Sequence, residues 1–436
     1  MRKIFVVLFC LILSVTYQTR SETYDYSHFL EQVKKNNKDL KIAHKELELA
    51  KATKKDAVSG ALPSVTASAG YNRNLSSLYM FADLSAMGGE GTSKFKINKN
   101  NEYRFAVNVN QTLFSGSVFY AIRAANEYNK LTGFVYDASF DEIITYAKKA
   151  FYQTLLLKHI WEISQESEKN AFENYSEMQN AFENGLVSEF TLLQAEVRYR
   201  DMIPQTSEAK RNYNIALLNL EDFAGAKTGE LTTVEGSLEK IPDMPQELKM
   251  NDILNKRPDY NAMMWEEKLR TTGVKAQNAE HFPKLSGYFT YAFSSQSDQF
   301  KFEDENNSYM VGLNLTVPIF SGGATSAKVQ QAKIELSKTQ LSIEKKRDEI
   351  DLELKNIILR LKEAYKRIES AKVTLKTAKK AFSIAESTSK AGLTTQLELK
   401  DSRVVMDQAQ LKYFVVIFEY LNAYFDWEKA TGKIES

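Results

Sequence analysis

The sequence is poor in the residues that build disulfide frameworks and thiol sites. Its one cysteine, Cys10, lies in the apolar stretch at the N-terminus, so the rest of the chain has no thiol. This excludes disulfides, cysteine metal sites and a cysteine nucleophile from that part. Val7, Leu8 and Phe9 stand before Cys10 in place of the small residues of a lipoprotein cleavage site. The simplest route to a lipid anchor is therefore excluded as well.

The chain also has no excess charge and no long apolar run. Lys plus Arg number 57 and Asp plus Glu 56, so the sequence gives no electrostatic case for a nucleic-acid partner. After residue 21 there is no run of about 18 apolar residues, and no transmembrane helix is expected. The best apolar run there, Phe414 to Phe418, is interpreted as a buried helix segment.

Catalytic and cofactor patterns are missing too. The four histidines lie on different predicted elements without the spacing of metal ligands: His28, His44, His159 and His281. The glycine cluster at residues 88–91 lacks the Gly-Lys-Ser/Thr ending of a phosphate loop, and we interpret it as a flexible loop tip. We find no set of nucleophile, base and orienting residue, and no cofactor fingerprint. The sequence predicts no enzyme, no metal site and no cofactor.

The N-terminus has the pattern of a secretory signal. Met1-Arg2-Lys3 is followed by an apolar stretch from Ile4 to Val15, which is too short to span a bilayer. Small residues allow cleavage after Thr16 or Ser21, and we prefer Ser21. Residues 1–21 are therefore expected to be a signal peptide.

The remainder of the chain consists of two similar repeats. Near the start of each copy, residues 37–40 match 257–260 and residues 62–65 match 282–285, both at an offset of 220 positions. Further along, the offset is smaller. Residues 113–116 match 319–322 at 206 positions, and residues 185–186 and 223–225 match 392–393 and 430–432 at 207 positions. Two offsets indicate two rigid blocks with a loop of unequal length, and the extra residues fall between Asn74 and Asn101. We expect a first repeat at 22–225, a linker at 226–250 and a second repeat at 251–436, intertwined as one domain.

Each repeat carries two predicted strands beside that loop. Apolar residues alternate with polar or small ones at Tyr103, Phe105, Val107 and Val109, and again at Tyr309, Val311, Leu313, Leu315 and Val317. The segments Val65 to Tyr71 and Leu285 to Phe293 alternate more weakly. Strands of about ten such residues fit a tilted membrane strand. A soluble sandwich is the alternative on strand pattern alone.

Long helices follow the strands. Apolar residues recur at alternating spacings of four and three from Ile350 to Ala385, a period that specifies coiled-coil packing, and subtracting 207 gives a weaker stripe from Ile143 to Met178. Residues 117–184 and 324–391 lack proline, so each can form a helix about 100 Å long. Asn184-Gly185 and Ala391-Gly392 should end these helices and permit an antiparallel return. Pro204 should kink the first returning helix.

One chain supplies four strands, whose sheet has two open edges. A bilayer does not tolerate unpaired backbone at a sheet edge, so several chains must close one barrel. The predicted fold class is mainly α with a membrane β-barrel.

Together these features resemble the TolC-like outer-membrane efflux family over nearly the whole chain after the signal. The resemblance is carried by the strand ends at 113–116 and 317–323, the helix start Arg257-Pro258-Asp259, and the turns at 185–188 and 392–395. It implies a homotrimer with a 12-stranded barrel in the outer-membrane lipid and a 12-helix barrel crossing the periplasm. The chain would be a passive duct for efflux or type I secretion, docked on a periplasmic adaptor and an inner-membrane pump of RND, ABC or MFS type.

The resemblance also marks two groups of residues. The helix-turn tips meet the adaptor in the family, and the corresponding residues here are Asn184, Gly185, Leu186, Val187 and Ser188, with Ala391, Gly392, Leu393, Thr394 and Thr395. Glu398 and Asp401 share one helix face and match paired aspartates that ring the periplasmic entrance in known members. A solvated helix face is the alternative for these two carboxylates. Ser389 and Thr394 stand where those members carry a tyrosine and an arginine that latch the closed mouth.

Two other classes of protein share parts of the pattern. A periplasmic adaptor or coiled-coil scaffold has long heptads and an export signal, but it does not account for four alternating strands. An autonomous porin or adhesin explains the strands but not the two long helices. The sequence leaves the substrate open, and drugs, metal ions and secreted polypeptides all fit.

Overall fold

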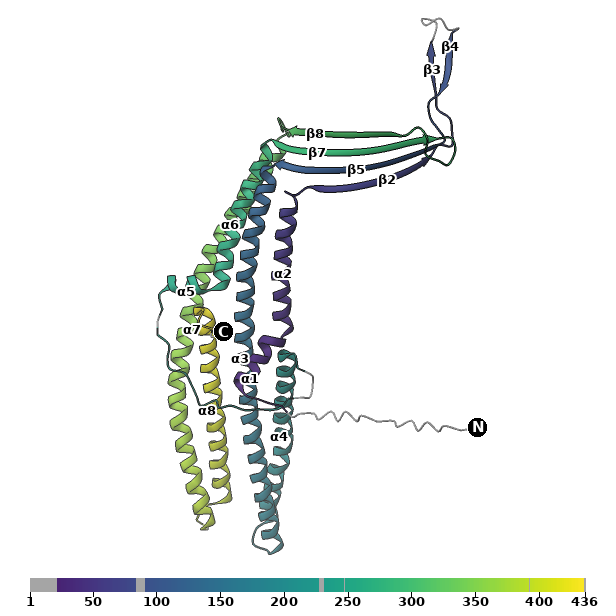
Figure 1. Cartoon of the computed structure of the whole chain (residues 1–436). Helices are drawn as coiled ribbons and strands as arrows, with labels where there is room; N and C mark the ends of the chain where they lie inside the picture. The colour runs from purple at the N-terminus through teal and green to yellow at the C-terminus, as the bar shows by residue number, and fades with distance from the viewer. Residues whose placement is uncertain (1–21, 84–90, 227–230, 247, 392, 435–436) are drawn as a thin grey trace, which may run out of the picture. The chain divides into compact units, whose positions relative to one another are not determined.

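The computed structural model describes residues 22–83, 91–226, 231–246, 248–391 and 393–434 (Figure 1). The expected signal peptide and Gly392 lie outside these residues. The chain forms two compact units. We call the unit made of Met1–Ala43, Ala138–Arg257 and Glu349–Ser436 the helical unit, and the unit made of His44–Asp137 and Pro258–Asp348 the sheet unit.

The centre of the sheet unit is an antiparallel sheet of four strands in the order β2-β5-β7-β8. The strands are β2 (Ser64–Arg73), β5 (Asn101–Phe114), β7 (Lys284–Ser297) and β8 (Asn306–Thr316). All four coincide with the alternating segments of the sequence, so the strand predictions are confirmed. Strands β2 and β8 form the edges and each has one neighbour in this sheet.

The register gives the sheet one apolar and one polar face. Val65 lies opposite Val109, Val109 opposite Phe289, and Phe289 opposite Val311, which makes an apolar row across all four strands. The next row, on the other face, is Thr66, Asn108, Thr290 and Met310. Thr290 donates to Asn108 within it, at 2.9 Å. Because side chains alternate between faces, the phase of the sequence decided which face is apolar.

The long connection between β2 and β5 contains an antiparallel hairpin that the sequence analysis did not predict, β3 (Tyr79–Asp83) and β4 (Thr92–Lys96). The expected flexible loop tip at the glycine cluster 88–91 lies almost wholly outside the described residues and stays a prediction. Residues 84–90 themselves lie outside the described residues. The sequence carries no clear signal for β3, because the aromatic residues Tyr79 and Phe81 stand between Leu78, Met80 and Ala82 and leave no alternation of apolar and polar residues.

Helices complete the sheet unit. They are α6 (Pro258–Asn278), the 3-10 turn η2 (Ala279–His281), the part of α2 (Lys38–Ser59) from His44 onward, and the first parts of α3 (Gly116–Glu183) and α7 (Ala324–Lys390). A Cβ added at Gly116 would lie 2.9 Å from Ala279 Cβ. This glycine therefore lets the start of α3 pack closely on η2.

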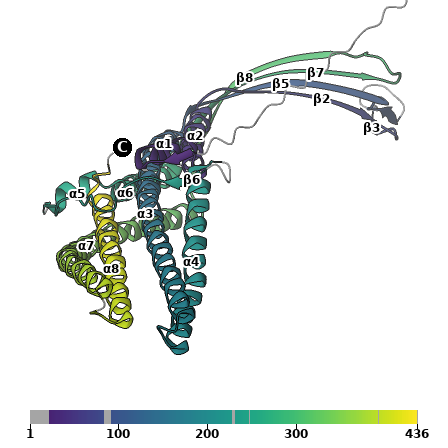
Figure 2. The same cartoon turned by 90° about the horizontal axis from the view of Figure 1, so that it is seen from below.

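The helical unit is built from the second parts of α3 and α7 with their returning helices. Helix α4 (Glu189–Ala224) lies beside α3, and α8 (Gln396–Thr431) lies beside α7, in both Figures 1 and 2. The smaller elements are α1 (Tyr26–Asn36), α5 (Met250–Lys256), and the parallel pair β1 (Glu22–Tyr24) and β6 (Leu231–Val234). Strand β6 lies inside the expected linker and was not predicted, because four residues are too few to show a period.

The coiled-coil stripe of α7 is confirmed by burial. Nine successive stripe positions are at most 9 % exposed: Ile350, Leu354, Ile357, Leu361, Ala364, Ile368, Ala371, Leu375 and Ala378. The run at Phe414 to Phe418 is also confirmed as a buried segment, with Val416 and Ile417 each 1 % exposed.

The stripe transferred to α3 was only partly right. Ile144, Phe151 and Leu155 are buried although they lie off that stripe. Phe151 stacks on Phe29 of α1 with ring centroids 5.7 Å apart, and Lys148 pairs with Glu428 of α8 at 2.8 Å. Helix α3 therefore buries a wider surface than a two-helix seam requires. Helix α4 continues through Pro204 as one helix.

Candidate functional site

The turn between α3 and α4 and the turn between α7 and α8 contain the same type of backbone hydrogen bond. In the first turn Gly185 has φ of 72°, and Leu186 N donates to Ala181 O at 2.8 Å. In the second turn Leu393 N donates to Thr388 O at 2.9 Å. A glycine in the left-handed region with this bond is the usual end of a helix that reverses direction.

Large apolar side chains are exposed at both turns. Leu186 and Leu393 are 77 % and 81 % exposed, and Phe190 and Leu397 just beyond them are 69 % and 61 % exposed. Such side chains clustered at the end of a helix pair mark a surface suited to a protein partner. The structure thus places the sequence-predicted tip residues, apart from Gly392, on two exposed turns.

The returning helices begin with different caps. Ser188 caps α4 by accepting from Thr191 N at 3.3 Å. Thr395 caps α8 in a full capping box, because its Oγ1 accepts from Glu398 N at 3.2 Å and its own N donates to Glu398 Oε2 at 2.9 Å. The hydrogen bond from the Thr395 backbone holds the pKa of Glu398 below its ordinary value. Glu398 therefore stabilises a helix end, a role that the sequence interpretation did not give it.

Asp401, the other predicted entrance residue, lies one turn further along α8 and is exposed. Burial lowers the pKa of Arg198 on α4, and the charges of Asp407 and, after it, Asp401 oppose this by favouring the charged guanidinium. Asp401 therefore contributes a minor part of the negative charge that acts on Arg198.

A charged network joins α3 to α8 near these residues. Arg403 pairs with Asp407 at 3.0 Å and with Glu166 of α3 at 3.0 Å, and Ser167 of α3 donates to Asp407 at 2.6 Å. The side chains of Arg403 and Asp407 are only 10 % and 14 % exposed. Sequence reasoning missed this network, although an Arg and Asp four apart within the apolar pattern of a helix were a visible signal.

A cavity of about 300 Å³ lies beside this network, between α3, α4, α7 and α8. Its lining includes Asn174, Arg198, Glu386, Leu399 and Arg403. Arg198 Nη1 is buried there with no hydrogen-bond acceptor among the described residues. Helices α3 and α8 therefore meet through polar and charged groups here, and this contact is less uniformly apolar than the α7 stripe.

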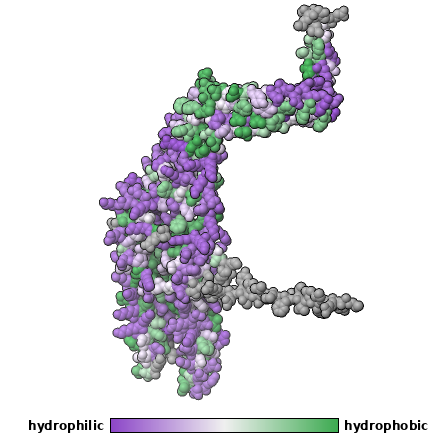
Figure 3. All heavy atoms as spheres, in the orientation of Figure 1, coloured by the Kyte–Doolittle hydropathy of each residue, from purple (hydrophilic) through white to green (hydrophobic). Residues whose placement is uncertain are grey.

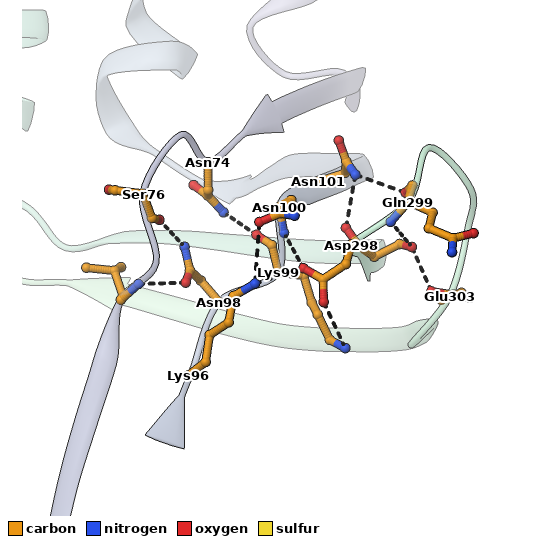
Figure 4. Close-up of polar contacts among 12 residues, drawn as sticks. Asn74, Ser76, Lys96, Asn98, Lys99, Asn100, Asn101, Asp298, Gln299 and Glu303 are labelled. Atoms are coloured by element: carbon orange, nitrogen blue, oxygen red, sulfur yellow. Dashed lines mark hydrogen bonds and ion pairs between the residues drawn. The ribbon is translucent and has the colours of Figure 1, made fainter. Parts of the chain in front are cut away.

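A second polar cluster lies at the end of the sheet where β5 begins and β7 ends (Figure 4). Asp298, just after β7, accepts from Lys96 Nζ at 3.0 Å and from Asn100 N at 3.1 Å. Asn101 Nδ2 donates to the carbonyls of Ser297 and Gln299, at 3.1 and 2.9 Å. These bonds tie the β4–β5 connection to the β7–β8 connection.

The hydropathy of the surface differs between the strands and the helices. On the face shown in Figure 3, hydrophobic residues gather over the strands, whereas the helices are mainly hydrophilic. No helix within the described ranges is long and apolar enough to cross a membrane. Among the residues with described positions, no group of three or more His, Cys, Asp or Glu could hold a metal ion.

Comparison with known proteins gives consistent matches. The profile of the outer membrane efflux protein family matches residues 29–226 and 250–433. The alkaline protease secretion protein AprF of Pseudomonas aeruginosa is 22 % identical over 250 residues, which are 56 % of this chain and 52 % of AprF. Outer membrane protein TolC of Salmonella enteritidis is 21 % identical over 344 residues, 76 % of this chain and 66 % of TolC. The matches thus span between half and two thirds of these relatives.

Solved structures share the fold over more of the chain. The CmeC outer membrane channel of Campylobacter jejuni superposes with a TM-score of 0.78 at 20 % identity, covering 94 % of this chain and 87 % of CmeC. The MtrE outer membrane channel of Neisseria gonorrhoeae, solved in its open state, gives 0.74 at 18 % identity, covering 93 % and 88 %. With the family profile matching both halves of the sequence, this chain belongs to the outer membrane efflux protein family.

Proposed function

We propose that this chain is one protomer of a passive channel that crosses the outer membrane and extends into the periplasm. The observation that carries the proposal is the sheet, which has one apolar face, one polar face and two edges with a single neighbour each. Three copies joined edge to edge form 12 strands, with the apolar face toward lipid and the polar face toward water. The long helices continue each protomer toward the periplasm, and transport needs no catalytic residue.

The test is assembly and conduction. Cross-linking of the purified protein in detergent should give a ladder that ends at the trimer, and the trimer should conduct in planar bilayers. A monodisperse monomer that still inserts into lipid contradicts the closed oligomer. A protein that leaves with the soluble or inner-membrane fraction supports the alternative, a periplasmic adaptor or scaffold, which the family match does not favour.

The duplication is part of the proposal, with repeats at 22–225 and 251–436 and a linker at 226–250. Supporting it, α3 and α7 have 68 and 67 residues, and α4 and α8 have 36 each. Each compact unit contains segments of both repeats. The repeats are therefore intertwined, and cutting the chain between them should leave neither half folded.

The two tips are proposed to bind a periplasmic adaptor, which in turn engages an inner-membrane pump. The exposed leucines Leu186 and Leu393 and the left-handed Gly185 support this role. Nothing lies within 4 Å of a Cβ added at Gly185, so Gly185→Val alters the tip by backbone strain of roughly 1–2 kcal/mol and not by a clash. The variant should insert normally but lose adaptor capture and export.

Gly185→Asn is the matched control, because asparagine adopts the left-handed conformation more readily. It should retain both functions. Unchanged adaptor capture and export in Gly185→Val contradict docking at this tip.

Glu398 and Asp401 are proposed to form acidic rings at the periplasmic mouth, with six carboxylates in a trimer. Their spacing places both on one side of α8, and Asp401 is exposed. The capping box with Thr395 holds Glu398 in a defined position. Rings of this kind favour cations over anions at a narrow opening.

The transported substrate follows from the pump, because the duct itself is permissive. AprF and the proteases secretion protein PrtF of Dickeya chrysanthemi are named for protease secretion, whereas BepC of Brucella suis is named as an outer membrane efflux protein. Efflux and type I secretion both fit this chain. Co-purification of the inner-membrane pump, identified by mass spectrometry, decides between them.

A further inference from the structure

The cavity between α3, α4, α7 and α8 lies wholly within the helical unit. Its wall consists of residues between 167 and 177 on α3, Arg198 on α4, residues between 382 and 389 on α7, and residues 399–403 on α8. Its volume of about 300 Å³ is at the lower end of the range of small-molecule sites. Since one water takes up about 30 Å³, the cavity has room for several waters or for one small organic molecule.

Arg198 brings an unused hydrogen-bond donor to this cavity. Its Nη1 atom is buried and finds no acceptor in the part of the chain that the structure describes. A buried donor without an acceptor destabilises a fold, and the cost is greater for a charged group than for a neutral one. A carboxylate that accepts from Nη1 removes this cost, because bonds between a guanidinium and a carboxylate are among the strong hydrogen bonds of proteins.

The charged side chains of the lining select the charge of a ligand. Both signs are present in equal number: Arg198, Lys400 and Arg403 are cations, and Glu173, Glu177 and Glu386 are anions. A simple anion is repelled by the three carboxylates, and a simple cation is repelled by the three cations. A zwitterion carries one charge of each sign, so each of its charged groups can lie beside a side chain of opposite charge.

Apolar side chains complete the lining. Ala171, Phe382 and Leu399 come from α3, α7 and α8. The guanidinium carbon of Arg403 lies 5.2 Å from the centre of the Phe382 ring, which places this ring beside the charged groups. Ligand sites commonly combine an apolar wall with a few polar groups that fix the orientation of the ligand. This lining therefore suits a molecule in which an apolar group lies next to two opposite charges, as in free leucine or phenylalanine.

We propose that this cavity binds a small zwitterion with an apolar side chain, of the class of the free amino acids, whose carboxylate accepts from Arg198 Nη1. The ammonium group of the ligand lies toward Glu173 and Glu177 on α3, and its side chain packs on Phe382 and Leu399. The ligand thus contacts the α3–α4 pair and the α7–α8 pair and stabilises the contact between them. The site is separate from the two tips, and the inference does not depend on the proposed oligomeric channel.

The first experiment measures binding to the full-length protein in detergent by isothermal titration calorimetry. L-Leucine and L-phenylalanine are the probes, and at least one of them should bind saturably. The amide of that amino acid lacks the carboxylate, and its N-acetyl derivative lacks the ammonium group. Each derivative should bind about ten times more weakly or worse, a loss of about 1.4 kcal/mol. No saturable binding of either amino acid up to about 10 mM, or equal binding of all three forms, overturns the proposal.

Substitution of the donor tests the carboxylate contact. Arg198→Met keeps a long side chain without the guanidinium and should weaken binding of the amino acid about tenfold or more. Because it also removes an unsatisfied buried donor, the melting temperature without ligand should be unchanged or higher. Arg200→Met is the matched control on the same helix, since the Arg200 side chain is 71 % exposed, and it should leave the affinity unchanged. Unchanged affinity in Arg198→Met overturns the contact.

A second variant tests the ammonium contact without touching the arginine. Glu173→Gln with Glu177→Gln should weaken binding of the amino acid but should not weaken the residual binding of its N-acetyl derivative, which has no ammonium group to lose. An equal loss for both molecules, or no loss for either, contradicts the orientation proposed for the ligand.

Hydrogen exchange tests whether the ligand joins the two helix pairs. A saturating concentration of the amino acid should raise the protection of residues 170–177 on α3 and of residues 399–403 on α8. Residues 209–217 on α4 lie outside the lining and should exchange as before. Binding that leaves both lining segments unchanged would show that the ligand does not stabilise the contact between the pairs.

Discussion

Thr395 donates two hydrogen bonds to Glu398, one from its backbone N and one from Oγ1, and both reach Oε2 at 2.9 Å. The corresponding turn of α4 has a cap from Ser188 but carries Thr191 at the position of Glu398. The two tips therefore differ in one carboxylate that is part of the backbone hydrogen bonding. This asymmetry makes the α7–α8 tip dependent on pH and leaves the α3–α4 tip as an internal reference.

The first prediction concerns this pH dependence. The hydrogen bond from the Thr395 backbone lowers the pKa of Glu398 from its ordinary value of 4.5. The stabilisation is therefore fully present above pH 4.5 and is lost as the pH falls through the lower folded value. Hydrogen-exchange protection of residues 395–399, corrected for intrinsic rates, should decrease in that range, whereas protection of residues 188–192 should not. An equal decrease at both tips contradicts the role of Glu398.

The second prediction separates charge from capping at the proposed entrance. Glu398→Gln with Asp401→Asn removes six charges from a trimer, while glutamine can still complete a capping box. The reversal potential measured in a salt gradient should move toward the value of a channel that does not discriminate between cations and anions. Block of the channel by trivalent cations should weaken. Glu189→Gln, at the other tip, should change neither. If the double variant conducts and is blocked like the unmodified channel, the two carboxylates form only a solvated helix face.

The third prediction concerns the contact between α3 and α8. Arg403→Met leaves Asp407 without its guanidinium partner in a nearly buried position, which should cost about 3–5 kcal/mol of unfolding free energy. Adding Asp407→Leu should recover part of that loss, because the nearly buried carboxylate that lost its partner is then removed as well. Urea unfolding followed by circular dichroism gives both values. Arg200→Met is the control, since Arg200 forms an exposed pair with Glu196 that is worth at most about 1 kcal/mol. Equal losses in Arg403→Met and the control would show that the network does not stabilise the fold.

The fourth prediction compares two glycines with nearly the same backbone angle. Gly185 and Gly225 have φ of 72° and 67°, so alanine suffers similar backbone strain at both. A Cβ at Gly225 additionally meets Asn36 O at 2.7 Å, whereas nothing lies within 4 Å at Gly185. Gly225→Ala should therefore lower the melting temperature more than Gly185→Ala does. Similar melting temperatures would mean that Asn36 moves aside without cost.

The sequence by itself determined the parts of this protein that depend on local periodicity. Period two fixed the four strands and their apolar face, period 3.5 fixed the buried stripe of α7, and Gly185 marked where α3 ends. Each of these is a property of neighbouring residues on one element. Local periods are therefore enough to find them.

Only the tertiary structure decided features that depend on which elements meet. Phe151 is buried because α1 and α8 also pack on α3, and β6 exists because β1 is present to pair with it. Glu166 on α3, the partner of Arg403, lies more than 200 positions away in the chain. The β3–β4 hairpin is held at its base by a bond from Lys96 to Asp298 in the β7–β8 connection. A hydrogen bond or ion pair between distant segments leaves no period in either of them, so the packing of the folded chain had to supply these contacts.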